Sequence, residues 1–517
     1  MINPLMNMDY PDPDVIRVED TYYMVSTTMH FMPGGAVLKS YDLMNWEIAS
    51  YIYDTLDDTP AQRLDGEKNI YGQGMWAPSI RYHKGMFYVL FAANDTHKTY
   101  LYRAADVCGP WEKNYIEGFY HDSSLFFDDD DRVYIIYGNK SIRITELDSG
   151  LNGPKEGGLD RIIVEDAGHP GLGFEGTHFY KINGRYYSFF IHSLRDRWFR
   201  TEACYTSDSL EGEFTGGDVL QDDMGYRGAG VAQGGIVDTP DGEWYAVLFQ
   251  DRGAVGRIPV LVPVRWENDY PVFGVDGKVP LEMNVKSTRP DYEYSPLYES
   301  DNFDYTSDKD GRYDMKKVWQ WNHAPKSELY TFEERKGALR LYSGKICSSL
   351  THAYNTLTQR TYDSFSEVSV TVDAECINEG DYAGICALQG LYAAIAVTKD
   401  SQGYELVMLG KDIEDCAGGV KPCDVAERVY DRHRISGPAV RLKCSFDCRD
   451  GKDEARFFYE CSKGWKELGD GKKMQFTLDH FTGCRYGLFY YSTIVEKGHA
   501  DFMKFVYTVL ESAGSVK

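Results

Sequence analysis

The sequence predicts an all-β protein: an N-terminal five-bladed β-propeller followed by a C-terminal β-sandwich. Three observations support this prediction. A hairpin pattern recurs five times before residue 290, helical periodicity is hard to find there, and short aromatic and β-branched strands with Gly or Asp turns continue along the chain. Repeats of about 45 to 65 residues that contain such hairpins are typical of propeller blades.

Each repeat opens on a distinctive residue, runs through a short apolar strand, turns, and resumes with a pair that contains an aromatic residue. These pairs are Tyr22-Tyr23, Phe87-Tyr88, Val133-Tyr134, Tyr186-Tyr187 and Trp244-Tyr245. Counting back 11 residues from each pair gives the opening residues Trp76, Asp122, Glu175 and Gln233; in the first repeat, a count of 10 gives Asp12. The first turn is interpreted as one residue shorter. We expect the five opening residues to be equivalent and to face the central channel.

The repeat stops after the segment PVRWENDYPVFGVDGKVP. The following residues are polar, interrupted by Pro and unpatterned, which is typical of a linker. Beyond them, strand candidates such as SEVSVTVDAEC and FMKFVYTVLE, with turn signals between them, predict a β-sandwich. The predicted boundaries are a propeller over residues 1–295, a linker over 296–314 and a sandwich over 315–517.

Composition excludes some partners. The net charge of −25 argues against nucleic acid and anionic membranes, because both need basic surfaces. No N-terminal signal and no run of roughly 20 apolar residues is visible. The 11 cysteines lack the spacing of a zinc site, so free thiols in a reducing cytoplasm are the favoured interpretation. We therefore expect a cytoplasmic protein without organic cofactor, and leave open whether it forms a homo-oligomer.

Three of the five opening residues are acids: Asp12, Asp122 and Glu175. Carboxylates that converge in an aromatic-lined pocket suit glycosidic bond cleavage. One protonates the leaving oxygen, while another activates water or attacks the anomeric carbon. A third carboxylate nearby would raise the pKa of the acid. Calcium binding by the same three acids is the rival interpretation, and acids that merely begin turns are the plainest one.

Several segments together resemble glycoside hydrolase family 43: NPLMNMDYPDPDVIRVEDTYYMVSTT, MWAPSI, DSSLFFDDD, FEGTHFYKINGRYY and GRIPVLVPVRWENDYPV. Members of that family are five-bladed propeller enzymes that act on arabinoxylan and related pentose polymers. Residues after about 300 resemble the concanavalin-like jelly roll of the β-xylosidase-like branch. In that branch the sandwich packs against the propeller and helps to close the pocket, which favours attack at chain ends.

The resemblance implies roles for individual residues. Asp12 in YPDPD matches the general base, Glu175 in FEGTH the general acid, and Asp122 in HDSSLFF the carboxylate that tunes and orients the acid. Family members invert the anomeric configuration. Contacts to the sugar are implied for Arg257, Trp76, His30 and Phe31. In many members a His of the fifth blade coordinates an axial calcium ion; the matching residue here is Gln233, so this metal site is expected only tentatively.

The favoured function is removal of terminal β-D-xylose from xylo-oligosaccharides. The alternative is an α-L-arabinofuranosidase, or a bifunctional enzyme, that acts on arabinoxylan fragments, because both sugars place comparable hydroxyls around the same acids. A non-catalytic sugar-binding propeller is a distant alternative, since such a protein would be expected to lose at least one acid. A retaining fructosidase fits poorly, because Glu175 is followed by Gly rather than Cys.

Overall fold

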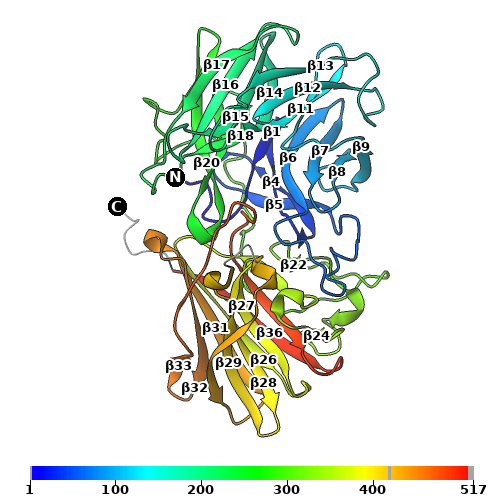
Figure 1. The fold of residues 1–517 in the computed structure, drawn as a ribbon, viewed down its shortest axis with the longest axis vertical. Helices are drawn as coiled ribbons and strands as arrows, with labels where there is room; N and C mark the ends of the chain where they lie inside the picture. Colours follow the sequence, from blue (N-terminus) through cyan, green and yellow to red (C-terminus); the bar gives the residue numbers. More distant parts are fainter. Residues whose placement is uncertain (1–2, 417–420, 511–517) are drawn as a thin grey trace.

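The computed structural model describes residues 3–416 and 421–510, and these residues form strands and short 3-10 helices only (Figure 1). Within them, five four-stranded antiparallel sheets form the propeller, and two larger sheets form the sandwich beside it. The all-β prediction and the order of the two domains are confirmed. No helix in the described part of the chain is long and apolar enough to cross a membrane.

Each blade consists of four strands that follow one another along the chain. The blades are I, β1 (Asp14–Val18), β2 (Thr21–Ser26), β4 (Gly34–Ser40) and β5 (Glu47–Tyr53); II, β6 (Met75–His83), β7 (Met86–Ala93), β8 (Lys98–Ala104) and β9 (Glu112–Ile116); III, β10 (Ser124–Phe127), β11 (Val133–Asn139), β12 (Ser141–Leu147) and β13 (Asp160–Glu165); IV, β14 (Glu175–Ile182), β15 (Arg185–Ser193), β16 (Arg200–Ser207) and β17 (Thr215–Leu220); V, β18 (Ala232–Asp238), β19 (Trp244–Asp251), β20 (Arg257–Glu267) and β21 (Tyr270–Phe273).

The sandwich has two antiparallel sheets. In spatial order, the first contains β3 (Phe31–Met32), β22 (Gln320–Asn322), β25 (Leu357–Arg360), β35 (Arg485–Ser492), β27 (Asp381–Leu388), β28 (Tyr392–Asp400), β29 (Gly403–Gly410) and β30 (Arg428–Arg434). The second contains β23 (Tyr330–Thr331), β24 (Leu339–Tyr342), β36 (His499–Val509), β26 (Phe365–Asp373), β31 (Ala439–Asp447), β32 (Glu454–Cys461) and β33 (Gly464–Glu467), while β34 (Lys472–Lys473) pairs with β32. The 3-10 helices are η1 (Gly253–Val255), η2 (Ser327–Leu329), η3 (Leu350–His352), η4 (Ile413–Cys416), η5 (Pro422–Asp424) and η6 (Arg449–Gly451).

The strand register corrects the predicted equivalence of the opening residues. The first residue of each aromatic pair lies opposite, in blade order, Arg17, Tyr82, Phe127, Lys181 and Asp238. Five residues before each of these partners stands a residue with positive φ: Asp12 (50°), Ala77 (34°), Asp122 (45°), Gly176 (65°) and Gln233 (58°). Trp76 and Glu175 therefore lie one residue before the equivalent position.

The shared count of 11 residues conceals this offset. Blades III and V have a hairpin turn one residue longer than the others, whereas in blades II and IV the counted residue, Trp76 or Glu175, stands one residue before the residue with positive φ. The first turn is as short as those of blades II and IV, so the count of 10 there reflects the absence of both differences.

Two residues further along the innermost strands, a second set surrounds the axis: Asp14, Ser79, Ser124, His178 and Gly235. The buried Asp14 carboxylate accepts a hydrogen bond from Arg81 Nη1 at 2.6 Å and lies 3.1 Å from His178 Nδ1. Arg81 also donates to Ser124 Oγ at 2.7 Å. A Cβ on Gly235 would lie 2.6 Å from Asp14 Oδ1, so only glycine fits there. Although burial opposes it, Arg81 and His178 hold the pKa of Asp14 below its ordinary value. This network joins blades I to V at the axis.

At the seam, the two domains are joined by backbone strand pairing as well as by packed side chains. Strand β3 leaves blade I and pairs with β22 of the sandwich, with Met32 opposite Trp321 and Phe31 opposite Asn322. One hydrophobic cluster contains Ile48, Ala254 and Val255 of the propeller together with most of the sandwich core. Burial of a common apolar core makes the two domains one unit.

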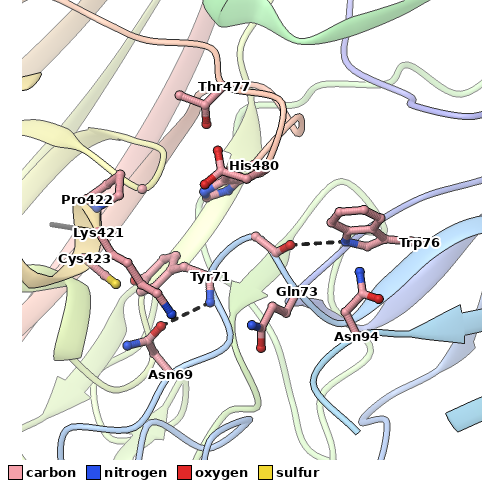
Figure 2. Close-up of a pocket in the computed structure, with 13 residues that line it drawn as sticks. Asn69, Tyr71, Gln73, Trp76, Asn94, Lys421, Pro422, Cys423, Thr477 and His480 are labelled. Carbon is pink, nitrogen blue, oxygen red and sulfur yellow. Dashed lines mark hydrogen bonds between the residues drawn. The ribbon is translucent and has the colours of Figure 1, made fainter. Parts of the chain in front are cut away.

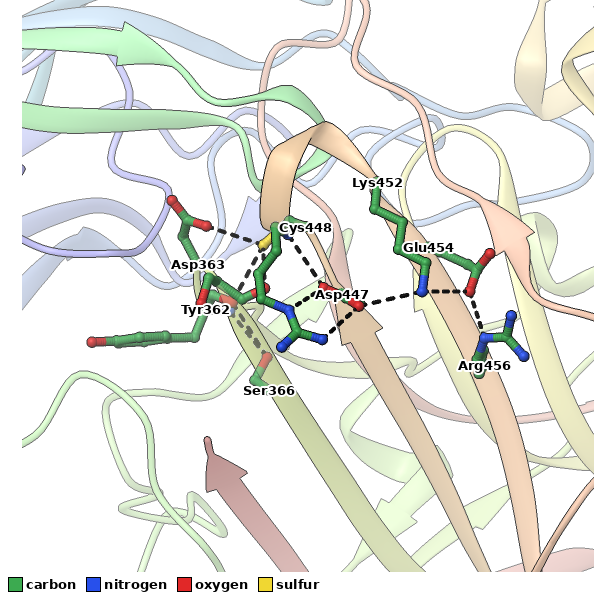
Figure 3. Close-up of polar contacts among 10 residues, drawn as sticks. Tyr362, Asp363, Ser366, Asp447, Cys448, Lys452, Glu454 and Arg456 are labelled. Carbon is green, nitrogen blue, oxygen red and sulfur yellow. Dashed lines mark hydrogen bonds and ion pairs between the residues drawn. The ribbon is translucent and has the colours of Figure 1, made fainter. Parts of the chain in front are cut away.

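A polar contact set lies at the tip of the β31–β32 hairpin, where the sandwich meets the propeller (Figure 3). Cys448 Sγ lies 3.2 Å from Asp363 Oδ1, and Arg449 Nε donates to Asp447 Oδ1 at 2.8 Å. In the turn that follows, a Cβ added to Gly253 of the propeller would lie 2.6 Å from Asp453 Oδ2. The predicted linker is likewise ordered: Glu299 N donates to Gln359 Oε1 at 3.1 Å, and Phe303 is part of the sandwich core.

Candidate active site

A cavity of about 220 Å³ lies where the innermost strands of the propeller begin. Its walls come from all five blades and from one loop of the sandwich. The lining residues are Asp12, Trp76, His121, Asp122, Asn139, Leu172, Glu175, Trp198, Arg200, Gln233, Arg257, Leu478 and Phe481. The structure therefore brings together all three predicted acids, together with Trp76, Gln233 and Arg257.

Asp12 is held from two sides inside the protein. Its side chain is 2% exposed, Thr27 Oγ1 donates to its Oδ2 atom at 2.7 Å, and Arg257 Nη1 donates to its Oδ1 atom at 2.6 Å. Thr27 Oγ1 in turn accepts a hydrogen bond from the backbone N–H of Ala77 at 2.8 Å. These contacts fix the position of the carboxylate.

Arg257 is buried because two aromatic rings cover it. Its guanidinium lies 3.8 Å from the ring centre of Phe481 and 4.4 Å from that of Phe249. Its Nε atom lies 3.3 Å from Asp251 Oδ1, and Asp251 also pairs with Arg200. A buried guanidinium needs an anionic partner, and Asp12 and Asp251 are those partners. Phe481 belongs to the sandwich, so the second domain completes the wall.

The other two acids share one histidine. His121 Nε2 lies 3.6 Å from Asp122 Oδ2 and 3.5 Å from Glu175 Oε2. Asn139 Nδ2 donates a hydrogen bond to the same Glu175 oxygen. Burial, opposed by His121 and reinforced by Glu175 and Asp12, raises the pKa of Asp122 to about 7. The charge of Asp122, opposed by burial and reinforced by Glu175, raises the pKa of His121 to about 9. Near neutral pH the histidine is therefore an imidazolium between two carboxyl groups.

Comparison with known families agrees with this geometry. The model of glycosyl hydrolases family 43 matches residues 1–271. The chain belongs to glycosyl hydrolase family 43. The model of a β-xylosidase C-terminal concanavalin A-like domain matches residues 300–508, which confirms the concanavalin-like sandwich. The protein is therefore a glycoside hydrolase, and the resemblance of its propeller motifs to family 43 is confirmed.

Named relatives within family 43 include two kinds of pentosidase. A β-xylosidase of Formosa agariphila is 26% identical over 98% of this chain and 90% of its own length. A putative β-xylosidase of Xylanibacter ruminicola is 31% identical over 75% of this chain and 72% of its own length. A non-reducing end α-L-arabinofuranosidase of Bacteroides ovatus is 26% identical over 66% of this chain and 64% of its own length.

The solved structure of a bifunctional GH43-CE protein of Bacteroides eggerthii superposes with a TM-score of 0.88, at 39% identity over 99% of this chain. This chain spans 64% of the length of that protein. The fold is therefore shared over both domains described above.

Two predicted sugar contacts lie outside the cavity of this family 43 enzyme. His30 is fully buried at the domain seam, where its ring lies 4.9 Å from that of Tyr71 and 4.8 Å from that of His323. Phe31 lies beneath the guanidinium of Arg485, 3.5 Å from its carbon. Both residues are drawn to the seam because residues 31–32 pair with the sandwich strand β22. The prediction that they line the pocket is corrected accordingly.

The tentative calcium ligand Gln233 lines the cavity, but its surroundings do not fit a calcium ion. Calcium takes about six to eight oxygen ligands. The side chain of Gln233 packs against Gly176, where a Cβ would lie 2.5 Å from Gln233 Cδ, and its backbone N–H donates to Glu202 Oε2 at 2.7 Å. Next along the axis stands the Arg81 guanidinium bound to Asp14.

The rival interpretation, in which the three acids hold calcium, is opposed by positive charges that already lie beside these acids. Donor atoms of His121, Asp122 and Glu175 lie within 4.8 Å of one another, which is close enough for one ion. His121, however, carries a proton near neutral pH, and Arg257 is bonded to Asp12. The positive charge that balances the acids comes from the protein itself.

Sequence reasoning missed several lining residues. His121 and Asn139 have no counterparts in the other blades, so the repeat could not predict them. The one available signal for His121 was its position directly before Asp122. Trp198, which is 50% exposed, and Arg200 lie at or beside the start of β16. Leu478 and Phe481 lie in an irregular loop of the sandwich, for which the sequence pattern gave no signal.

Proposed function

We propose that this family 43 enzyme is exo-acting and removes terminal β-D-xylose from xylo-oligosaccharides. The observation that carries the proposal is the convergence of three acids in a cavity of about 220 Å³ that the sandwich residues Leu478 and Phe481 help to close. Such a cavity has room for one sugar ring rather than for a chain. The relatives named β-xylosidase support the choice of sugar.

In the proposed mechanism Asp12 is the general base. Held by Thr27 and Arg257, it accepts a proton from the water that attacks the anomeric carbon. Glu175, held by Asn139, donates a proton to the leaving glycosidic oxygen. Direct attack by water inverts the anomeric configuration.

Asp122 acts on the general acid through charge. Its pKa of about 7 means that the carboxyl group carries a proton for part of the time near neutral pH, so its charge beside Glu175 changes within the working range. His121 lies between the two carboxyl groups and limits their mutual repulsion. Asp122 and His121 thus tune and orient Glu175 and do not contact the scissile bond.

The second candidate is α-L-arabinofuranosidase activity, alone or together with xylosidase activity, on arabinoxylan fragments. The relative from Bacteroides ovatus that is named for this activity favours it. Both sugars present comparable hydroxyl groups to the same three acids, so the same mechanism applies to either.

The test is a comparison of initial rates on the 4-nitrophenyl glycosides of β-D-xylose and α-L-arabinofuranose and on xylobiose. We expect the wild type to prefer the xyloside, and Glu175→Ala to lose xylobiose cleavage by at least about 100-fold, because general acid catalysis contributes on that order. The control is Glu211→Ala, an exposed glutamate of the same blade. Preference for the arabinoside would promote the second candidate. Absence of cleavage of all three would overturn the proposed substrate class.

We also propose a cytoplasmic location. It is supported by the cysteines: all eleven, which lie within the described ranges, are free, and free thiols persist in reducing compartments.

A further inference from the structure

Two buried arginines face each other where the sandwich meets the N-terminal segment of the propeller. Arg360 on β25 and Arg485 on β35 are direct partners in the strand register, and they are 2% and 1% exposed. Directly opposite residues of an antiparallel pair lie on the same face of the sheet, and like charges in that position destabilise the pair. The arrangement therefore needs a compensating group.

The protein supplies neither guanidinium group with an ion pair. Arg360 Nε donates to the backbone oxygen of Asp9 at 2.8 Å, and Arg485 Nη1 donates to Gln320 Oε1 at 2.8 Å. Both acceptors are neutral. Burial, reinforced by the charge of Arg360, lowers the pKa of Arg485, so its positive charge is unfavourable in these surroundings.

Several polar atoms of this cluster have no hydrogen-bond partner among the described residues. The donor atoms are Arg360 Nη2, Arg485 Nε, Arg485 Nη2 and the hydroxyl group of Tyr10, whereas the one acceptor among them is Asp9 Oδ2. Asp9 is also the acid whose charge acts on both guanidinium groups, so two positive charges meet one negative charge. Unused donors and positive charge are both in excess.

Aromatic rings close this cluster off from solvent. A cavity of about 290 Å³ lies at the seam, and His480 forms part of its wall (Figure 2). The ring of His480 lies 5.1 Å from that of His30, which lies 4.3 Å from that of Phe31. Phe31 in turn covers the guanidinium group of Arg485. Bulk water therefore does not screen the charge of Arg485, and a buried charge of this kind is stable only when it is paired.

We propose that a small monovalent inorganic anion, of which chloride is the example, binds between the guanidinium groups of Arg360 and Arg485. The anion accepts hydrogen bonds from the unused donor atoms and also balances the excess charge, whereas water molecules would do only the first. The site is independent of the sugar on which the enzyme acts.

The place of this site in the fold gives the anion a structural role. Arg360 holds the backbone of Asp9, and Asp9 Oδ1 accepts a hydrogen bond from the backbone N–H of Arg257 at 2.8 Å. Arg257 is the residue that binds Asp12. An anion that holds Arg360 and Arg485 together thus fastens the sandwich to the segment that leads to Asp12.

The first test measures Tm of the full-length protein in mixtures of sodium chloride and sodium gluconate of equal ionic strength. For a Kd of about 1 mM, raising chloride from about 1 to about 100 mM should raise Tm by about 2 °C, because the anion binds only the folded form. In Arg360→Gln this rise should disappear, since one of the two charges is removed. The matched control is Arg434→Gln, an exposed arginine of β30, which should keep the rise.

A crystal of the wild type soaked in sodium bromide provides a measurement that needs no variant. We expect a bromide anomalous-scattering peak within hydrogen-bonding distance of Arg360 Nη2 and Arg485 Nη2. Absence of the peak would overturn the inference and leave water as the partner of these donors. The same chloride-dependent rise in Arg360→Gln as in wild type would overturn it too, as would a bromide peak without any effect of chloride on Tm, which would show binding at crystal concentration only.

Discussion

Among single residues, His121 shows best how the charges of the carboxyl groups in the catalytic cavity are balanced. Three carboxyl groups line a space of about 220 Å³, and two of them lie within 3.6 Å of one imidazole nitrogen. The third is bonded to Arg257. Each acid thus lies beside a cation, although Asp122 and Glu175 share one, and these cations offset the cost of burying the carboxylates.

Replacement of His121 tests this arrangement. In His121→Gln the positive charge that lowers the pKa of Asp122 is lost, so that pKa rises further above 7. The limb of the kcat/KM profile that depends on Asp122 should then move to higher pH by roughly half a unit or more. His97→Gln, an exposed histidine of blade II, serves as the control. A profile that coincides with that of wild type would exclude His121 from this role.

Within the hairpins, the residue with positive φ decides where the acids point. In blade IV that residue is Gly176, and it sets Glu175 one position earlier than Asp12 and Asp122 in their blades. A Cβ on Gly176 would lie 2.5 Å from Gln233 Cδ, whereas a Cβ on Gly184 in the turn of the same hairpin meets nothing within 4 Å.

This pair of glycines allows a matched comparison. Gly184→Ala should cost about 1 kcal/mol of stability through backbone strain alone and leave kcat unchanged. Gly176→Ala adds a clash that displaces Gln233 and Glu175, so it should lose more stability and lower kcat at least about tenfold. Urea unfolding and initial rates measure the two effects. Equal behaviour of the two variants would contradict the role given to Gly176.

The axial network makes a second prediction for the blades. Arg81→Met leaves Asp14 buried without its cation and should destabilise the protein by about 3–5 kcal/mol. Arg103→Met, which removes an exposed pair with Glu112 on blade II, should cost less than about 1 kcal/mol.

Addition of a chelator to the wild type should leave Tm unchanged, because the axial donors already bind protein cations. A fall in Tm on chelation would restore calcium as the axial element.

What the sequence could predict follows from these hairpins. The repeat located Asp12, Asp122 and Glu175 because each blade repeats the same pairing of strands. It missed the one-residue offset of Glu175, because the hairpin turns of blades III and V are longer by the same one residue. It could not find Phe481, since that residue reaches Arg257 through packing of two domains and not through any repeat. His30 was misplaced because β3 pairs across the seam.

On the scale of the whole molecule, a cluster of three buried histidines lies at the seam. The ring of His30 lies 4.8 Å from that of His323 and 5.1 Å from that of His480. Burial lowers the pKa of all three; like-charge repulsion reinforces it for His30 and His323. The domains therefore meet around uncharged imidazole rings.

Acid should weaken this seam. Because the folded-state pKa values lie below the ordinary 6.5, the unfolded chain binds more protons, and stability falls as the pH drops below 6.5. With a folded-state pKa of about 4, His480 alone would account for about 2 kcal/mol at pH 5. Asp9, whose pKa burial raises to about 6, acts in the opposite direction between pH 6 and 4.

The measurement is the change in Tm between pH 7 and pH 5. We expect His480→Gln to shrink that change relative to wild type, whereas His433→Gln on β30, away from the seam, should leave it as it is. An identical pH dependence in all three proteins would exclude the seam histidine as a source of acid sensitivity.

The stacking of Phe481 on Arg257 has a consequence for the lifetime of the enzyme. A sugar in the catalytic cavity would contact both domains at once, since that cavity takes its walls from each. Any ligand that binds only the assembled form stabilises it in proportion to the logarithm of its concentration. The enzyme should therefore unfold more slowly while its substrate is abundant, and faster once the substrate has been consumed.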